Sequence, residues 1–185
     1  MVNDILKDLE AGLAKAQDSL KRELAKVRTG RANLALLDGV RVDYYGTPTP
    51  LNQVASVSTP DARLIQIKPW EKKLIPAIED AIRKSELGVN PNSDGEVVRI
   101  PIPSLTEERR RDLTKVVKRM GEDARVAIRN QRRDANEMLK EYQSGGDITE
   151  DEQTQGTKKV QAAIDKGIAV VDELVSKKEA EIMEV

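Results

Sequence analysis

The fold is decided by one long stretch, Ser104 to Tyr142, which reads SLTEERRRDLTKVVKRMGEDARVAIRNQRRDANEMLKEY. Its apolar residues recur at steps of three and four, which places them on one face of an α-helix. That face contains Leu113, Val116, Val117, Met120, Ala124, Ile128, Ala135, Met138 and Tyr142. Ser104 and Glu107 have the spacing of a capping box, so the helix is predicted to begin there. Such a helix of about 36 residues would be roughly 54 Å long, and its apolar face needs partner helices.

Two further amphipathic helices are predicted, one toward each end of the chain. After the Gly145-Gly146 pair, Thr149 and Glu152 form a second capping box ahead of another apolar stripe. This stripe contains Val160, Ile164, Ile168, Val171, Leu174, Val175 and Ile182. Residues 2–28 carry a similar stripe, and Gly30 follows it as a natural stop. That first stripe contains Leu6, Leu9, Leu13, Ala16, Leu20, Leu24 and Val27.

The segment between the first two long helices is rich in β-branched residues and turn formers. Four short runs resemble strands. They are Val40 to Tyr45, Val54 to Ser58, Leu64 to Lys68 and Val97 to Ile102. Segments 46–50, 59–61 and 90–95 separate them with proline, glycine, asparagine and aspartate, which favour turns. Pro76 to Glu86 carries isoleucines at helical spacing and is predicted to form a short helix.

These elements predict an α+β protein, an antiparallel three-helix bundle with a small β/α/β domain inserted into it. We expect residues 1–30 and 105–185 to form the bundle and residues 31–104 to form the inserted domain. The chain then crosses between the domains twice, near glycine on one side and just after prolines on the other. Hinges are commonly such element ends, so we expect one at Thr29, Gly30, Arg31, Pro103, Ser104, Leu105 and Thr106.

Composition narrows the classes of function. The 185 residues include no cysteine and no histidine, which removes thiolate chemistry, the commonest general base and the commonest zinc ligand. Catalysis by Asp, Glu, Lys or Tyr stays possible, so these absences count against an enzyme without excluding one. Our expectation is a non-enzymatic protein without a cofactor or metal. No apolar run approaches the roughly 20 residues of a membrane span, and the amino terminus lacks the apolar block of a signal peptide. We expect a cytoplasmic protein that does not bind membranes.

The net charge of −1 conceals a strong separation of charge along the chain. Residues 109–133 hold ten basic residues against three acidic ones, whereas residues 134–185 hold six against thirteen. Helical spacing places six of the cations on one stripe, interrupted only by Glu122. They are Arg111, Lys115, Lys118, Arg125, Arg129 and Arg132. A solvated helix face usually mixes charges of both signs, so the pattern favours contact with nucleic-acid phosphates.

Several motifs resemble those of the ribosome recycling factor family, bacterial type, and the resemblance runs from end to end. Each motif alone is weak evidence for the family, but the five motifs in this order are specific to it. The strings are Val27-Arg28-Thr29-Gly30-Arg31-Ala32, Tyr44-Tyr45-Gly46-Thr47-Pro48-Thr49-Pro50-Leu51, Leu87-Gly88-Val89-Asn90-Pro91-Asn92-Ser93, Leu105-Thr106-Glu107-Glu108-Arg109-Arg110 and Arg129-Asn130-Gln131-Arg132-Arg133-Asp134-Ala135-Asn136.

The resemblance implies an L-shaped molecule with the dimensions of a transfer RNA. It also implies that the protein binds the post-termination ribosome, and that elongation factor G, using GTP, drives separation of the subunits and release from mRNA. The bundle would contact large-subunit ribosomal RNA. The contact residues that the resemblance implies are Arg28, Arg31, Arg110, Arg129, Arg132 and Arg133. The implied partners are thus the ribosome and elongation factor G, bound by a monomer.

Three other functions stay open at this level. A scaffold could use the long helices in an intermolecular coiled coil, with the basic face against an acidic partner. A hydrolase would need paired carboxylates on facing strands, for which the strand runs offer only Asp43 and Glu96. A general nucleic-acid chaperone would bind any duplex, which the net charge of −1 disfavours.

Overall fold

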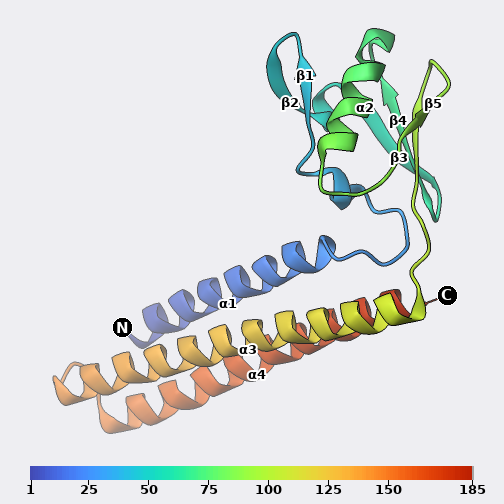
Figure 1. Cartoon of the computed structure of the whole chain (residues 1–185). Coiled ribbons are helices and arrows are strands. Elements are labelled where there is room, and N and C mark those ends of the chain that lie inside the picture. The colour runs from blue at the N-terminus through green and yellow to red at the C-terminus, as the bar shows by residue number, and fades with distance from the viewer. Residues whose placement is uncertain (185) are drawn as a thin grey trace. The chain divides into compact units, whose positions relative to one another are not determined.

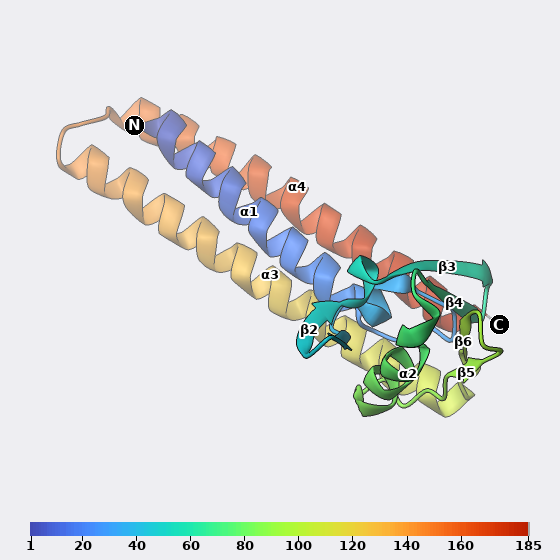
Figure 2. The ribbon, with the colours of Figure 1, turned by 90° about the horizontal axis from the view of Figure 1, so that it is seen from above.

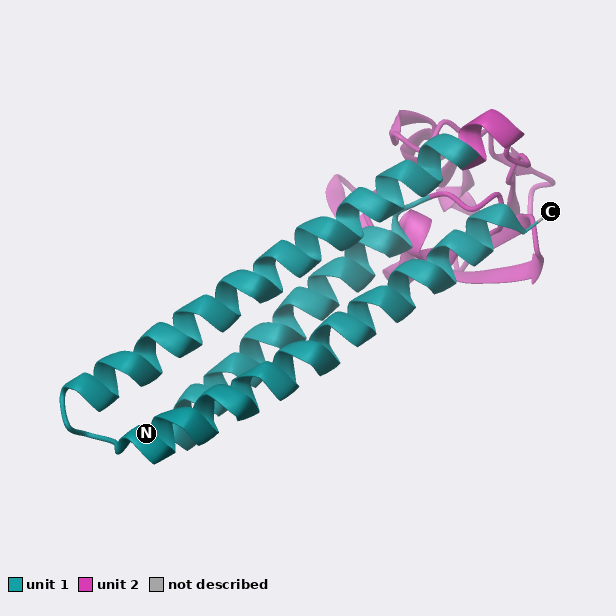
Figure 3. Ribbon diagram, turned by 90° about the horizontal axis from the view of Figure 1, so that it is seen from below, with its two compact units in different colours: residues 1–27, 111–185 teal, residues 28–110 magenta. Residues whose placement is uncertain are grey.

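The computed structural model describes residues 1–184, and the chain divides into two compact units (Figure 3). Unit 1 comprises Met1–Val27 and Arg111–Val185, and unit 2 comprises Arg28–Arg110. The predicted fold class, a helical bundle interrupted by a small α/β module, is confirmed. The predicted domain limits, at residues 30/31 and 104/105, lie three and six residues from these divisions and stay a prediction.

Unit 1 is built from three long helices: α1 (Val2–Ala25), α3 (Glu107–Ser144, whose first turn belongs to unit 2) and α4 (Glu150–Met183) (Figure 1). The predicted break at Gly145-Gly146 turns the chain back, so α4 runs antiparallel to α3 (Figure 2). Helix α1 runs alongside α4 in the same direction, since Val2 lies beside Gly156 and Leu13 beside Gly167. Each helix turns its apolar stripe inward, where Val117, Ile128, Leu139, Val160, Ile164, Val171 and Ile182 are fully buried.

The starts of the long helices follow their capping chemistry, with one correction. Thr149 and Glu152 form the predicted capping box: the Glu152 N–H donates to Thr149 Oγ1 at 3.2 Å, and the Thr149 N–H donates to Glu152 Oε2 at 2.8 Å. The prediction that Ser104 and Glu107 cap α3 was wrong. Thr106 caps it instead, because its Oγ1 accepts from the Arg109 N–H at 3.1 Å. Helix α3 therefore begins two residues later than a Ser104 cap requires.

The end of α1 differs slightly from the sequence prediction. The helix was predicted to reach residue 28 and ends at Ala25. The Lys26 and Val27 N–H groups donate to carbonyls three residues back, at 3.2 and 3.1 Å, so the last turn is tighter than an α-helix. Val27 is nevertheless buried, and Gly30 has a φ of +76°, a conformation that favours glycine.

Unit 2 contains two antiparallel sheets and a short helix. One sheet pairs β1 (Arg41–Tyr44) with β2 (Thr47–Pro50). The other has the strand order β3-β4-β6-β5. Its strands are β3 (Ala55–Asp61), β4 (Leu64–Pro69), β5 (Asn92–Ser93) and β6 (Val98–Pro101). Helix α2 (Ile75–Lys84) packs against β1 and β6, and short 3₁₀ turns lie at Leu34–Leu37, Leu51–Gln53 and Lys72–Leu74.

The four predicted strand runs and the short helix are confirmed, whereas three segments predicted as turns contain strand residues. Residues 47–50 form β2, residues 59–61 extend β3, and Asn92–Ser93 form β5. Pro48 and Pro50 are tolerated in β2 because, within residues 1–184, that strand pairs only with β1, so a missing N–H on its other side breaks no ladder. Beneath the sheets, Val42, Ile67, Ile78, Ile82 and Val98 are fully buried and form the centre of the core of unit 2.

Candidate nucleic-acid interface

Helix α3 carries all six cations of the predicted stripe, so their common face follows from one uninterrupted helix. They differ in exposure. Arg111, Lys115, Lys118 and Arg129 are exposed, whereas Arg125 and Arg132 are half-buried. The helical spacing therefore identifies the face correctly, and the neighbouring helix decides how far each cation reaches into solvent.

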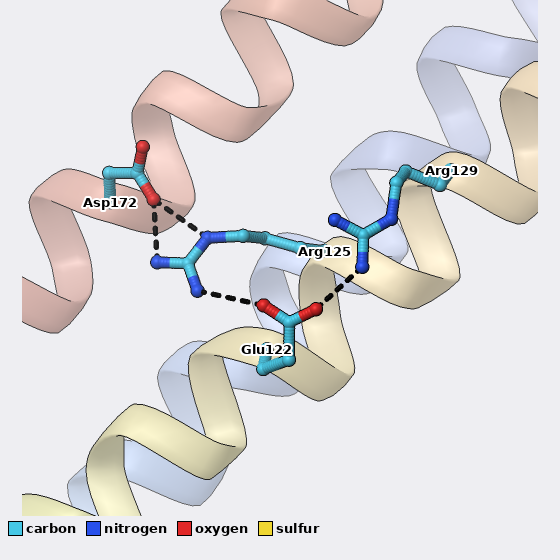
Figure 4. Close-up of polar contacts among 4 residues, drawn as sticks. All are labelled: Glu122, Arg125, Arg129 and Asp172. Atoms are coloured by element: carbon cyan, nitrogen blue, oxygen red, sulfur yellow. Dashed lines mark hydrogen bonds and ion pairs between the residues drawn. The ribbon is translucent and has the colours of Figure 1, made fainter.

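Arg125 departs most from the expected outward orientation. Its Nε and one terminal nitrogen donate to the same carboxylate oxygen of Asp172 on α4, at 2.8 and 2.6 Å (Figure 4). The other terminal nitrogen contacts Glu122 at 3.4 Å. Only 25% of the Arg125 side chain is exposed, and the hydrogen bonds to Asp172 raise its pKa. Arg125 thus joins α3 to α4 and reaches less far into solvent than its place on the stripe suggests.

Glu122, the only acid on the stripe, holds a second arginine. One of its oxygens accepts from a terminal nitrogen of Arg129 at 2.5 Å, two helical turns further along α3 (Figure 4). The Arg129 hydrogen bond is the main cause that holds the pKa of Glu122 below its ordinary value, so the group is charged at neutral pH. The Arg129 side chain is still 44% exposed. It can therefore be reached by a ligand even while it is paired.

The two arginines that follow are held more loosely. Arg132 donates to the Gln161 side chain on α4 at 3.4 Å, which is close to the limit for a hydrogen bond. Arg133 lies 3.8 Å from Asp134 and 3.9 Å from Glu137, and its side chain is 68% exposed. Long, exposed ion pairs such as those of Arg133 contribute little to stability. The guanidinium groups of both residues are therefore available to an anionic partner.

The six arginines named from motif resemblance do not gather at one point. Arg129, Arg132 and Arg133 lie in the middle of α3, whereas Arg110 is in its first turn, nineteen residues earlier and about 28 Å along the helix axis. Arg28 and Arg31 lie near Gly88 and Gly30 in unit 2, to which Arg110 also belongs. Any single partner that contacts all six must therefore extend along the helix.

The two chain crossings come together inside unit 2. A Cβ placed on Gly30 would lie 3.4 Å from both the backbone nitrogen and the Cγ of Leu105. Residues 26–33 and 102–106 contain no helix or strand. The segments in which we expect a hinge are thus adjacent and irregular, and the hinge itself stays a prediction.

The carboxylates considered for a hydrolase are not paired. Asp43 accepts from the Gly46 N–H at 2.8 Å and closes the β1–β2 turn, whereas Glu96 contacts Lys72 at 3.2 Å. Within residues 1–184, no three acidic side chains lie close enough together to hold a metal ion. No helix in that range is both long and apolar enough to cross a membrane.

Sequence reasoning missed Asp172 and Lys178, both on α4. Asp172 lies 47 positions from Arg125, and no local pattern links the two residues. Lys178 is the buried charged side chain of the bundle, 7% exposed, with its ammonium 3.5 Å from Glu181. Lysine rarely occupies a buried position, and a polar residue gave no reason to expect a core site. Helical spacing could have found it, because position 178 lies three residues after Val175 and four before Ile182, on the apolar stripe.

Comparisons with known proteins agree with the motif resemblance. Residues 20–183 match the family model described as "Ribosome recycling factor". The chain is 60% identical over 185 residues to the ribosome-recycling factor of Anaeromyxobacter sp. (strain Fw109-5), which covers all of this chain and 99% of that protein. It is 53% identical to the ribosome-recycling factor of Sorangium cellulosum (strain So ce56), with all of both chains covered.

Two solved structures share the fold. A solution structure of the ribosome recycling factor matches with a TM-score of 0.81 and 41% identity, covering 100% of this chain and 98% of that one. A second structure matches with a TM-score of 0.69 and 42% identity, covering all of both chains. It contains models for the T. thermophilus ribosome recycling factor and the E. coli elongation factor G bound to the E. coli post-termination complex.

Proposed function

The chain belongs to the ribosome recycling factor family, and from this premise we propose that it acts on the ribosome after termination. It binds the post-termination complex as a monomer and, with elongation factor G and GTP, promotes dissociation of the subunits and release from mRNA. One observation carries the proposal: the match to relatives extends over the full length of the chain, with both units included.

A member of this family is a translation factor rather than a catalyst of a chemical reaction. We propose that the protein contributes shape and differential binding. It favours a ribosome state in which contacts between subunits are weakened, and GTP hydrolysis on elongation factor G supplies the drive. No covalent step on this chain is needed, which agrees with a sequence that has no histidine and no cysteine.

The function is tested by light scattering and sucrose-gradient sedimentation of post-termination complexes. With this protein, elongation factor G and GTP together, we expect the ribosomes to separate into subunits, and we expect little separation when any one of the three is omitted. Separation that is equally fast without the protein would refute the proposed function.

For the ribosomal contact, we propose that large-subunit RNA phosphates bind Arg28, Arg31, Arg110, Arg129, Arg132 and Arg133. The exposure of Arg129 and Arg133 and the loose hold on Arg132 support this. Structured RNA is recognised largely through its backbone and its grooves, and a long helix with spaced arginines suits such a partner.

The contact is tested by reversing one charge inside the stripe and one outside it. Arg132→Glu is expected to weaken binding to large subunits and to make the salt dependence shallower, since each phosphate contact contributes about 0.9 to the slope for duplex nucleic acid. Arg119→Glu makes the same charge change at an exposed position of α3 that does not belong to the stripe. Equal losses for both variants would show that only net charge matters.

We further propose that the two crossings, Thr29 to Arg31 and Pro103 to Thr106, act as hinges during splitting. The left-handed conformation of Gly30 and the irregular backbone of both segments support the proposal. A cysteine pair that joins the two crossings, in a chain with no cysteine of its own, should bind ribosomes when oxidised, lose splitting and regain it on reduction. Full splitting by the verified disulfide form would contradict the hinge.

A further inference from the structure

The four side chains in Figure 4 assign different roles to two arginines of the same stripe. Arg125 is held at three nitrogens, two of them by Asp172 and one by Glu122. Arg129 gives a single terminal nitrogen to Glu122, and the part of the chain that the structure describes, residues 1–184, shows no second acceptor for it. Arg125 is thus fixed by the fold, whereas Arg129 depends on one carboxylate.

We propose that the Glu122 carboxylate competes with phosphates of the ribosomal RNA for the Arg129 guanidinium. This competition lowers the affinity of the stripe for RNA. This inference rests on the proposed function, because it concerns the same phosphate-binding face. Glu122 presents to the guanidinium what a phosphate presents, an anionic oxygen at hydrogen-bonding distance. RNA can use that nitrogen of Arg129 only after Glu122 releases it.

The geometry makes this competition reversible. Glu122 and Arg129 are both about half exposed, and exposed ion pairs are weak and sensitive to salt. A phosphate can pair with two nitrogens of a guanidinium, whereas Glu122 engages one. A well-placed phosphate therefore displaces Glu122, and when the protein leaves, the carboxylate takes Arg129 back. Glu122 thus limits how tightly the factor holds RNA and favours its release.

Release of Arg129 leaves the helix packing intact. Arg125 keeps both hydrogen bonds to Asp172, which do not involve Glu122. The contact between Glu122 and Arg125 is longer, at 3.4 Å, and adds little to the bond with Asp172. Replacing Glu122 by glutamine therefore changes the state of Arg129 without disconnecting α3 from α4.

The test is a double-mutant cycle on binding to large ribosomal subunits across a salt series. Glu122→Gln should raise the affinity about two- to fivefold, the range expected for losing one exposed ion pair, and should steepen the salt slope. The gain should vanish when Arg129 is also replaced by methionine. Asp123→Asn is the matched control: it removes the same charge from the next, exposed residue, and its effect should not depend on Arg129.

Two results would overturn the inference. A lower affinity of the Glu122→Gln protein would mean that Glu122 holds Arg129 ready for RNA. A gain that persists with methionine at position 129 would reflect net charge alone. The same cycle on a generic duplex RNA reads the competition without the ribosome. If the parent protein fails to bind large subunits, the proposed function is refuted. An Arg129-dependent gain on duplex RNA would still support the inference in that case.

Discussion

Substituting alanine for Gly121 in α3 should destabilise the bundle, whereas the same change at Gly12 in α1 should stabilise it. Both glycines lie inside long helices and face a neighbouring helix. A Cβ on Gly121 would lie 2.6 Å from Cγ2 of Val175, and a Cβ on Gly12 would lie 2.6 Å from Oε1 of Gln131. The two distances are equal, so the result depends on how easily each neighbour moves.

The neighbours differ in stiffness. Val175 is buried, and a β-branched side chain in a helix has one strongly preferred rotamer, so α3 and α4 must move apart to relieve the overlap. Overpacking of this kind costs about 1 to 3 kcal/mol, and the better helix propensity of alanine returns about 1 kcal/mol. We expect Gly121→Ala to lower the free energy of unfolding by about 1 kcal/mol.

At Gly12 the obstacle is the end of a flexible side chain. The carbonyl oxygen of Gln131 is buried without a hydrogen-bond partner, so a rotation that moves it costs no existing bond. The propensity term then dominates, and Gly12→Ala should raise the free energy of unfolding by up to about 1 kcal/mol.

The assay is urea unfolding followed by far-ultraviolet circular dichroism, which is dominated by the three long helices of unit 1. The transition midpoints should move in opposite directions at a similar slope. A Gly121→Ala protein as stable as the Gly12→Ala protein would refute the reasoning, because it would show that Val175 yields as easily as Gln131.

Three further predictions concern single side chains. Thr149→Ala removes the capping box of α4 and should cost about 1 kcal/mol in urea unfolding, whereas Thr154→Ala, at an exposed position inside the same helix, should cost less. Lys178→Met keeps the buried packing and should leave stability nearly unchanged, whereas Lys178→Glu buries a carboxylate beside Glu181 and should lower the melting temperature strongly. In unit 2, the N–H groups of Val97 and Glu96 and the Arg99 guanidinium hold the pKa of Asp94 well below its usual range. Because the folded pKa is depressed, Asp94 stabilises the fold above its ordinary pKa, near 4, and loses that contribution as pH falls further. In the Asp94→Asn protein, the free energy of unfolding should therefore fall less steeply as pH drops below about 4. Unfolding can be followed by the fluorescence of Trp70, the only tryptophan.

Much of the fold was predictable because local chemistry determines it. Apolar residues at steps of three and four located the three long helices, and Thr149 with Glu152 located the start of α4. The prolines of β2 misled the prediction, because a proline is excluded from a central strand but not from one with a single neighbour. Ser104 was predicted to cap α3 because Glu107 follows it at the spacing of a capping box, whereas the Thr106 hydroxyl accepts the hydrogen bond that caps the helix.

The sequence predicted which face of α3 carries the candidate interface, but it did not predict which cations on that face are paired with acids. Helical spacing alone places Arg129 and Arg132 on the outer side of α3. The state of Arg125 depends on the register between α3 and α4, which brings Asp172 within 2.6 Å of its guanidinium. No pattern within one helix contains that information, because register arises from the packing of two.

Part of the positive charge of α3 is neutralised by acidic side chains of the bundle itself. In the sequence, a basic segment is followed by an acidic one, and in the fold the two helices lie antiparallel, side by side (Figure 2). Asp172 neutralises Arg125 across the helices, and Glu122 neutralises Arg129 along α3. The six cations of the stripe thus set an upper bound on its phosphate contacts. If RNA displaces Glu122 but not Asp172, at most five of them reach phosphates, and the salt dependence of binding by the stripe should be correspondingly smaller than the charge of α3 suggests.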